Sequence, residues 1–146
     1  MRELGFSVMW LKLNQEQYTT FRFPRKDKDW EVGEIVRVVF HPRSKDRKVL
    51  GTAQIMGKQP RTLAPYSPAP VTPEEALEDG FESLMIMRNW MRKRYGNLKA
   101  CNPMNKLTIL WVSRDTYCFQ CGVRTHGMKF CEKHSQVALE DDCAPD

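Results

Sequence analysis

A proline-rich segment in the middle of the chain sets the strongest limit on how the chain can fold. The segment from Leu63 to Pro73 contains four prolines: Pro65, Pro68, Pro70 and Pro73. Proline lacks a backbone N–H and fixes φ, so this segment cannot be a central strand, and we expect it to cross the surface as an extended connector. It separates a first part rich in strand patterns from a second part that begins with helix patterns.

Four segments before the connector and one after it have the composition of β-strands. The β-branched run from Ile35 to Phe40 predicts a strand most clearly. In Tyr18 to Phe23, polar and apolar residues alternate, which predicts one polar face and one packing face. The polar face comprises Tyr18, Thr20 and Arg22. The other predicted strands are Phe6 to Leu13, Val49 to Gly57 and Lys106 to Ser113.

Two helices are predicted after the connector. Thr72, followed by Pro73 and then by Glu75, forms a capping box with proline at the first helical position, so a short helix should begin there and end near residue 80. A second helix is expected from Glu82 to Tyr95, before a terminating glycine. Its stripe of apolar residues is interpreted as core and not as a cofactor pocket: Leu84, Met87, Met91 and Tyr95.

Length and composition favour one globular domain with a small appendage. The chain has 146 residues, of which 41% are hydrophobic and 28% are charged. It has no apolar run of membrane-spanning length and no signal-peptide pattern at its start. We therefore expect a soluble, intracellular and cytoplasmic protein without a membrane partner.

The positive charge is concentrated in all but the last nine residues. The net charge is +5, but residues 138–146 hold four acidic residues and no basic one, so residues 1–137 carry 23 basic against 14 acidic residues. A strongly basic surface attracts polyanions, of which nucleic acid is the most common soluble one. A basic surface that serves only solubility explains the charge about equally well. Residues 138–146 are expected to form a disordered acidic tail.

Four potential metal ligands follow the last predicted strand. They are spaced as Cys-x2-Cys, nine residues, and Cys-x2-His: Cys118, Cys121, Cys131 and His134. Two ligands separated by two residues can hold one ion from a tight turn, and four ligands close a tetrahedral shell with no place for substrate. The spacing predicts one structural Zn2+ in a zinc knuckle at residues 115–137.

Other interpretations of these residues stay open. His126 or Cys143 could replace His134 as a ligand, and the cysteines could also be free and clustered by chance. The odd count of five cysteines favours a reducing compartment over a disulfide framework. The remaining cysteine, Cys101, is interpreted as a small buried hydrophobic residue.

The order of motifs in residues 1–114 resembles the ASCH family, a branch of the PUA-like β-barrels. Gln15 to Arg22 (QEQYTTFR) lies where the family commonly shows a Gly-x-Lys-x-x-Thr-x-Arg pattern and agrees with it at Thr20 and Arg22. Glu75 to Phe81 (EALEDGF) is similar to the family's Ala-x-x-Glu-Gly-Phe helix. Further similar stretches are Trp30 to Arg37, Gly51 to Ile55 and Leu107 to Val112. The resemblance implies an α+β fold, a small PUA-like β-barrel with two or three helices, and a cleft for RNA or modified nucleosides. The zinc segment lies outside it.

The resemblance also implies which residues face that cleft. Thr20 and Arg22 fall on the motif threonine and arginine, Asp79 falls where the family has glutamate, and Gln17 falls where some members have lysine. In the family's amidohydrolases for acetylated cytidine, the lysine, threonine and glutamate are regarded as catalytic. Glutamine cannot accept a proton at neutral pH, so only Thr20 and Asp79 are carried over as catalytic candidates. Lys12, from the preceding predicted strand, is the alternative amine.

Three functions follow from these observations. The first is an RNA-binding or nucleoside-binding module in which Arg22 and Arg25 hold phosphates, while Gln17, Thr20 and Asp79 bind the base. The second is a hydrolase, either an amidohydrolase or a ribonuclease, with Asp79 as general base. The third is a protein-interaction module in which the zinc knuckle contacts a partner. The sequence leaves the oligomeric state open.

Overall fold

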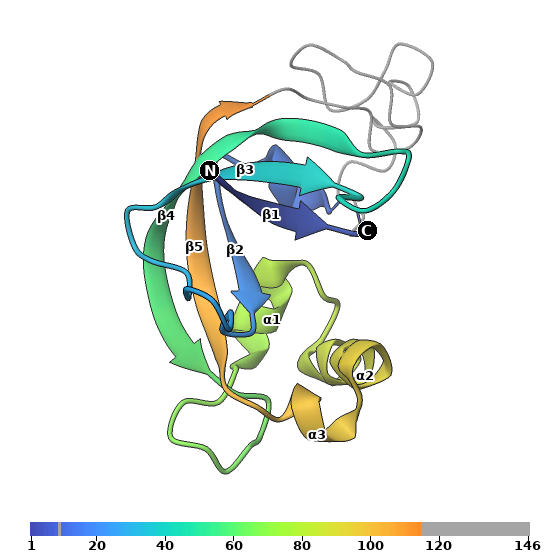
Figure 1. Cartoon of the computed structure of the whole chain (residues 1–146). Coiled ribbons are helices and arrows are strands. Elements are labelled where there is room, and N and C mark those ends of the chain that lie inside the picture. Colours follow the sequence, from blue (N-terminus) through green and yellow to red (C-terminus); the bar gives the residue numbers. More distant parts are fainter. Residues whose placement is uncertain (9, 115–146) are drawn as a thin grey trace. The chain divides into compact units, whose positions relative to one another are not determined.

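The computed structural model describes residues 1–8 and 10–114 and shows an α+β fold (Figure 1). Its elements in chain order are the strand β1 (Arg2–Phe6), the 3-10 turn η1 (Leu11–Asn14), the strands β2 (Gln17–Arg22), β3 (Ile35–Phe40) and β4 (Lys48–Arg61), the helices α1 (Pro73–Asp79), α2 (Leu84–Tyr95) and α3 (Asn97–Ala100), and the strand β5 (Met104–Arg114). Among the residues described, no helix has the length and apolar character needed to cross a bilayer.

The five strands form one mixed sheet in the order β1-β3-β4-β5-β2. β1 pairs with β3 in parallel, and β3 pairs with β4 antiparallel. Over residues 1–8 and 10–114 the sheet is not closed, because β1 and β2 remain its two end strands. The predicted α+β class is confirmed, but the sheet of this part of the chain does not close into the predicted small β-barrel. Closure requires the two end strands, β1 and β2, to pair with each other, and in this part of the chain they do not.

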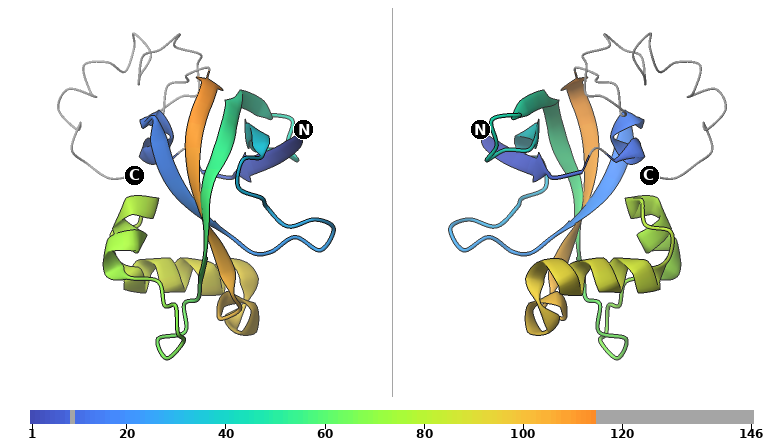
Figure 2. Two further views of the ribbon diagram at one scale, coloured as in Figure 1. Left: turned by 90° about the vertical axis from the view of Figure 1, so that its left-hand side faces the viewer. Right: turned by 90° about the vertical axis from the view of Figure 1, so that its right-hand side faces the viewer.

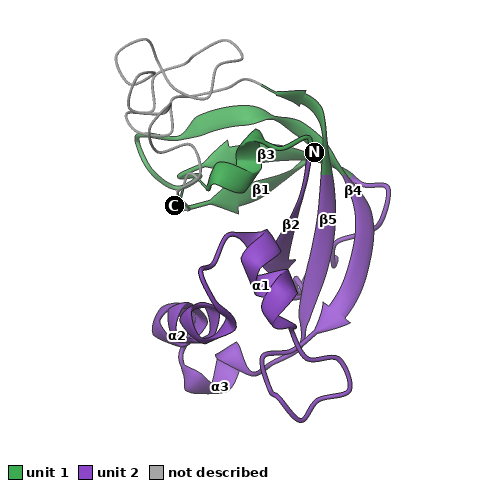
Figure 3. Cartoon of the chain, turned by 180° about the vertical axis from the view of Figure 1, so that it is seen from behind, with its two compact units in different colours: residues 1–16, 35–54, 110–146 green, residues 17–34, 55–109 purple. Residues whose placement is uncertain are grey.

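The chain divides into two compact units (Figure 3). Unit 1 comprises residues 1–16, 35–54 and 110–146, and unit 2 comprises residues 17–34 and 55–109. β4 and β5 each contribute one part to either unit. Unit 2 contains all three helices.

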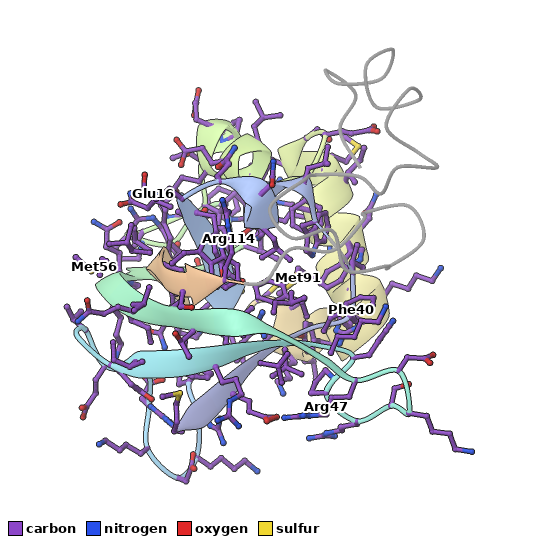
Figure 4. All side chains as sticks on the ribbon, turned by 90° about the horizontal axis from the view of Figure 1, so that it is seen from above. Glu16, Phe40, Arg47, Met56, Met91 and Arg114 are labelled. Carbon is purple, nitrogen blue, oxygen red and sulfur yellow. The ribbon has the colours of Figure 1, made fainter. Side chains whose placement is uncertain are left out.

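Unit 1 is built on aliphatic strand residues. Leu4 of β1 and Val36 and Val38 of β3 are fully buried. The register shifts between Val38 and Val39, where the backbone of Gly51 has φ 148°. A Cβ at position 51 would lie 2.2 Å from the carbonyl oxygen of Ser113 in the neighbouring strand β5. This position in β4 therefore requires glycine. The turn between β3 and β4 is basic, and its Arg47 (Figure 4) pairs with Glu3 of β1.

The predicted strand from Phe6 to Leu13 is wrong beyond its first residue. β1 ends at Phe6, and Leu11–Asn14 forms the 3-10 turn η1. Short apolar runs fit a strand or a buried turn equally well, so periodicity alone does not separate them. Tertiary contacts fix the turn here, because the carbonyl oxygen of Leu13 accepts hydrogen bonds from the Trp111 indole at 3.1 Å and from Arg114 at 3.3 Å.

The two predicted helices of unit 2 are confirmed, although α2 begins at Leu84, two residues later than predicted. The Thr72 hydroxyl accepts a hydrogen bond from the Glu75 N–H, and the Glu75 carboxylate accepts one from the Thr72 N–H, both at 3.1 Å. Gly80 ends α1 with φ 113°. Ser83 caps α2, and Gly96 ends it with φ 88°. α1 packs on β2 and α2, and α2 packs on α3, a helix that the sequence analysis did not predict (Figure 2).

A buried ion triad joins three elements of unit 2. Arg61 of β4 donates from Nε to both carboxylate oxygens of Glu75 at 3.1 Å, and the Lys106 ammonium of β5 lies 2.7 Å from Oε2. Burial by itself would raise the pKa of Glu75, but the hydrogen bonds from Lys106, the Thr72 backbone and Arg61 lower it to about 2. The carboxylate is therefore ionised at neutral pH and fixes α1 to both strands.

A second polar network holds the loop after β2. The Asp29 carboxylate accepts hydrogen bonds from the Asn105 amide at 2.9 and 3.1 Å and pairs with the Lys58 ammonium at 3.0 Å. Burial raises the pKa of Asp29, but these bonds and the Trp30 N–H lower it overall. The loop is thus attached to β4 and β5 by charge-assisted bonds.

Most of the other predicted elements are confirmed. β2, β3, β4 and β5 correspond to the predicted strands, although β4 is longer than predicted and extends to Arg61. The proline connector contains no strand between residues 63 and 72 apart from one isolated bridge, Thr62 to Pro70. Met87 and Met91 are buried in the core, as predicted, but Tyr95 at the end of the same stripe is 38% exposed.

Candidate functional site

β2 directs two of the predicted site residues, Thr20 and Arg22, toward the inside of unit 2, together with Tyr18. Tyr18 and Thr20 are only 3% and 4% exposed, and Arg22 is half-buried. The predicted polar face of this strand is therefore a buried face, which the sequence pattern does not reveal. The reason is that α1 packs against β2. Buried polar groups favour polar neighbours, and Arg22 interacts here with Thr20, Tyr18 and Asp79.

We call Tyr18, Thr20, Arg22 and Asp79 the β2 cluster. Arg22 Nε donates a hydrogen bond to the Thr20 hydroxyl at 3.2 Å. Asp79, at the end of α1, is 5% exposed and close enough to act on the guanidinium charge. Burial lowers the pKa of Arg22, while the neighbouring Tyr95 and Asp79 raise it. The fold therefore brings together three of the five predicted ligand-facing residues: Thr20, Arg22 and Asp79.

The other two predicted residues lie in different surroundings. Gln17 is exposed at the start of β2, and strand alternation places it with Thr19 and not with Thr20. Arg25 lies in the loop after β2, where its Nε donates to Asp27 at 3.2 Å and its guanidinium is 5.3 Å from the Trp30 ring centre. Neither side chain has a described contact with the β2 cluster.

The hydrogen bond to Thr20 limits the chemistry of the cluster. Its donor is a guanidinium, which stays protonated in proteins and cannot accept the threonine proton. A hydroxyl nucleophile needs a neighbouring base. The alternative amine, Lys12, belongs to unit 1, where it is 5% exposed in η1 and lies 5.7 and 5.5 Å from the Phe6 and Trp10 ring centres. This geometry fits a cluster that orients Arg22 better than one that activates Thr20.

Sequence reasoning missed a row of alternating rings and cations at the end of α2. The Phe23 and Tyr95 rings meet edge to face, 4.9 Å apart at 79°. Lys99 Nζ lies 5.2 Å from the Phe23 ring centre and 5.5 Å from that of Tyr95. The Arg94 guanidinium lies 5.7 Å from the Tyr95 ring centre and 5.3 Å from that of Trp90. We call these five residues the α2-end row.

One sequence signal could have found this row. Residues 83–109 contain six basic residues and no acidic one. The helical spacing of the α2 stripe assigned Tyr95 to the core, so the ring was not connected with these basic residues. Pairing of Phe23 with Tyr95 depends on tertiary structure and has no mark in the sequence.

The predicted metal ligands lie outside the described residues. This applies to Cys118, Cys121, Cys131 and His134, and to the alternatives His126 and Cys143. In the part of the chain that the structure describes, no group of three or more His, Cys, Asp or Glu side chains could hold a metal ion. Cys101 is exposed, so its assignment as a buried hydrophobic residue is wrong; it follows the last turn of α3.

Comparisons of the chain with protein-family models, with curated proteins and with solved structures find no match. The resemblance to the ASCH family therefore stays a prediction that depends on the motifs quoted for it.

Proposed function

We propose that the chain is an RNA-binding or modified-nucleoside-binding module of the PUA-like ASCH type. The observation that carries the proposal is Arg22, which Thr20 holds at 3.2 Å and which Asp79 and Tyr95 neighbour. An arginine oriented in this way presents fixed donors, as recognition of a phosphate or a base edge requires. The surplus of basic residues in residues 1–137 supports a polyanionic partner.

Binding is favoured over hydrolysis by the surroundings of the two catalytic candidates. Thr20 and Asp79 are about 95% buried, and the hydroxyl of Thr20 already accepts a hydrogen bond from a permanent cation. Their role in the proposal is to position Arg22. Hydrolysis of RNA or of acetylated cytidine would need a base that acts on Thr20. The exposed Gln17 is not a base, and Asp79, the general-base candidate, interacts with the guanidinium of Arg22.

The test is the affinity for a short single-stranded RNA, measured by fluorescence anisotropy at increasing salt. Affinity should fall steeply with salt, and Arg22→Gln should weaken it and reduce the slope by roughly 0.7, the value for one phosphate contact on a single strand. The matched control is Arg37→Gln, which removes one exposed arginine from β3. Thermal unfolding of both variants checks that the fold is retained. Absence of binding to any RNA at low salt would overturn the proposal.

We further propose one structural zinc ion held by Cys118, Cys121, Cys131 and His134. The support is the regular spacing of the two ligand pairs and the closed shell that four ligands give. Elemental analysis should find about one zinc per chain. A His134→Ala variant should lower the zinc content, whereas a chain that retains all its zinc would point to His126 or Cys143 as the fourth ligand. A metal-free native chain would contradict the site.

A further inference from the structure

We propose that the α2-end row is a stacking site for a base of single-stranded RNA, placed beside the phosphate or base held by Arg22. This inference rests on the proposed function and assigns a second subsite to it. The site residues are Tyr95 as the stacking ring and Arg94 and Lys99 as the cations next to it.

The ring at the centre of the row is accessible. Tyr95 is 38% exposed, although Met87 and Met91 of the same helix stripe are buried. Phe23 contacts it edge to face at 4.9 Å, which holds the orientation of the phenol ring. A fixed, partly exposed aromatic ring is the platform on which proteins stack unpaired bases.

The charge around the ring fits a nucleic acid strand. Arg94 and Lys99 are exposed and lie 5.7 and 5.5 Å from the Tyr95 ring centre. Arg92 and Lys93 of the same helix end are also exposed, and residues 83–109 contain no acidic residue. Rings alternating with cations match a strand in which bases alternate with phosphates. An acidic peptide would pair with the cations but would leave the rings without a role.

The row and the β2 cluster are neighbours. Phe23, the residue after Arg22, meets the Tyr95 ring at 4.9 Å, and Tyr95 and Arg94 also interact electrostatically with the guanidinium of Arg22. One ligand can therefore contact Arg22 and Tyr95 together if it offers a phosphate and an unstacked base on adjacent nucleotides. Bases in a duplex are stacked on both faces, so the arrangement selects single strands.

The experiment compares three probes: a short oligoadenylate, the same strand in an RNA duplex, and heparin, a polyanion without bases. Tyr95→Leu should weaken oligoadenylate binding roughly tenfold, the effect of one lost base stack, and leave its salt slope unchanged. Tyr95→Phe keeps the ring and should bind like the unmodified chain. Tyr66→Leu is the matched control, because Tyr66 is 99% exposed and has no ring or cation contact in the α2-end row. Heparin binding should be equal in all four proteins.

The outcomes distinguish a failure of the stacking site from a failure of the proposed function. If Tyr95→Leu binds oligoadenylate as tightly as Tyr66→Leu does, while Arg22→Gln binds it weakly, the stacking site is overturned and the proposed function stands. If heparin and oligoadenylate lose affinity equally in Tyr95→Leu, the residue acts through the fold and the stacking site is overturned as well. If polyglutamate competes as well as oligoadenylate, the row is a site for acidic peptides. If the unmodified chain binds no RNA, the proposed function fails first.

Discussion

The two units bury different kinds of side chain. In the part of unit 1 that the structure describes, the buried side chains are aliphatic or aromatic with the exception of Lys12. Unit 2 buries four polar or charged residues among those described: Thr20, Glu75, Asp79 and Asn105. A buried ion costs desolvation energy and is tolerated only with good partners. Unit 1 is therefore stabilised mainly by apolar packing, whereas unit 2 combines an apolar core, which includes Met87, Leu107 and Ile109, with buried polar groups, some of which belong to the candidate site.

The strongest test of this difference removes the carboxylate of the ion triad. Glu75→Ala leaves Arg61 and Lys106 without their buried partner and removes one of the two hydrogen bonds of the α1 capping box, so it should destabilise the protein by about 3–5 kcal/mol. The matched change in unit 1 is Glu3→Ala, which breaks a pair whose side chains are 36–38% exposed and should cost less than about 1 kcal/mol. Urea unfolding measures both. Equal losses of unfolding free energy would show that the two units depend equally on their ion pairs.

A substitution at glycine gives the next largest effect, and here unit 1 should be the more sensitive. In Gly51→Ala the new Cβ would lie 2.2 Å from the Ser113 carbonyl oxygen and 2.6 Å from the Arg114 Cα, both of them backbone atoms, so we expect a loss of about 2–3 kcal/mol. In unit 2, Gly33 has φ 91°, but a Cβ added there would have no atom within 4 Å. Gly33→Ala should therefore cost only the strain of a left-handed backbone, about 1 kcal/mol. The two melting temperatures compare them directly, and a milder effect at position 51 would mean that β5 can move away.

The pH dependence of stability should come mainly from unit 2. The pKa of Glu75 is lowered from 4.5 to about 2 in the folded chain, so its contribution is complete above pH 4.5 and is lost as the pH falls toward 2. Asp29 acts in the same direction, because its pKa is also lowered. Unfolding free energy should therefore decrease between pH 4.5 and 2. Glu75→Gln should flatten this decrease, and an unchanged profile would assign the acid sensitivity to other carboxyls.

Local sequence signals predicted the elements of unit 2 well and part of unit 1 poorly. The Thr72 capping box and the terminating Gly80 and Gly96 act within one helical turn, so their spacing alone predicts α1 and α2. The segment after Phe6 offers no comparable signal. Its turn η1 depends on Trp111 and Arg114, which lie about 100 residues further along the chain.

The candidate site was likewise predicted in part by local motifs and in part depends on tertiary contacts. The motif in β2 selected Thr20 and Arg22, and the structure brings both together with Asp79. The sequence pattern did not reveal that the face of β2 with Thr20 and Arg22 is buried, or that Gln17 belongs to the opposite face. It also missed Tyr95, since an aromatic residue on a helix stripe is expected to pack inward.

Local sequence patterns were sufficient to predict where α1 starts, where α1 and α2 stop, that β2 to β5 are strands, and that the chain carries excess positive charge. These properties depend on backbone conformation and composition over a few neighbouring residues. Only the tertiary structure decided that the sheet remains open over the described residues, that Glu75 binds Arg61 and Lys106, and that Phe23 meets Tyr95. The physical reason is that these contacts join residues 14 to 72 positions apart, and their free energy depends on burial that no local pattern records.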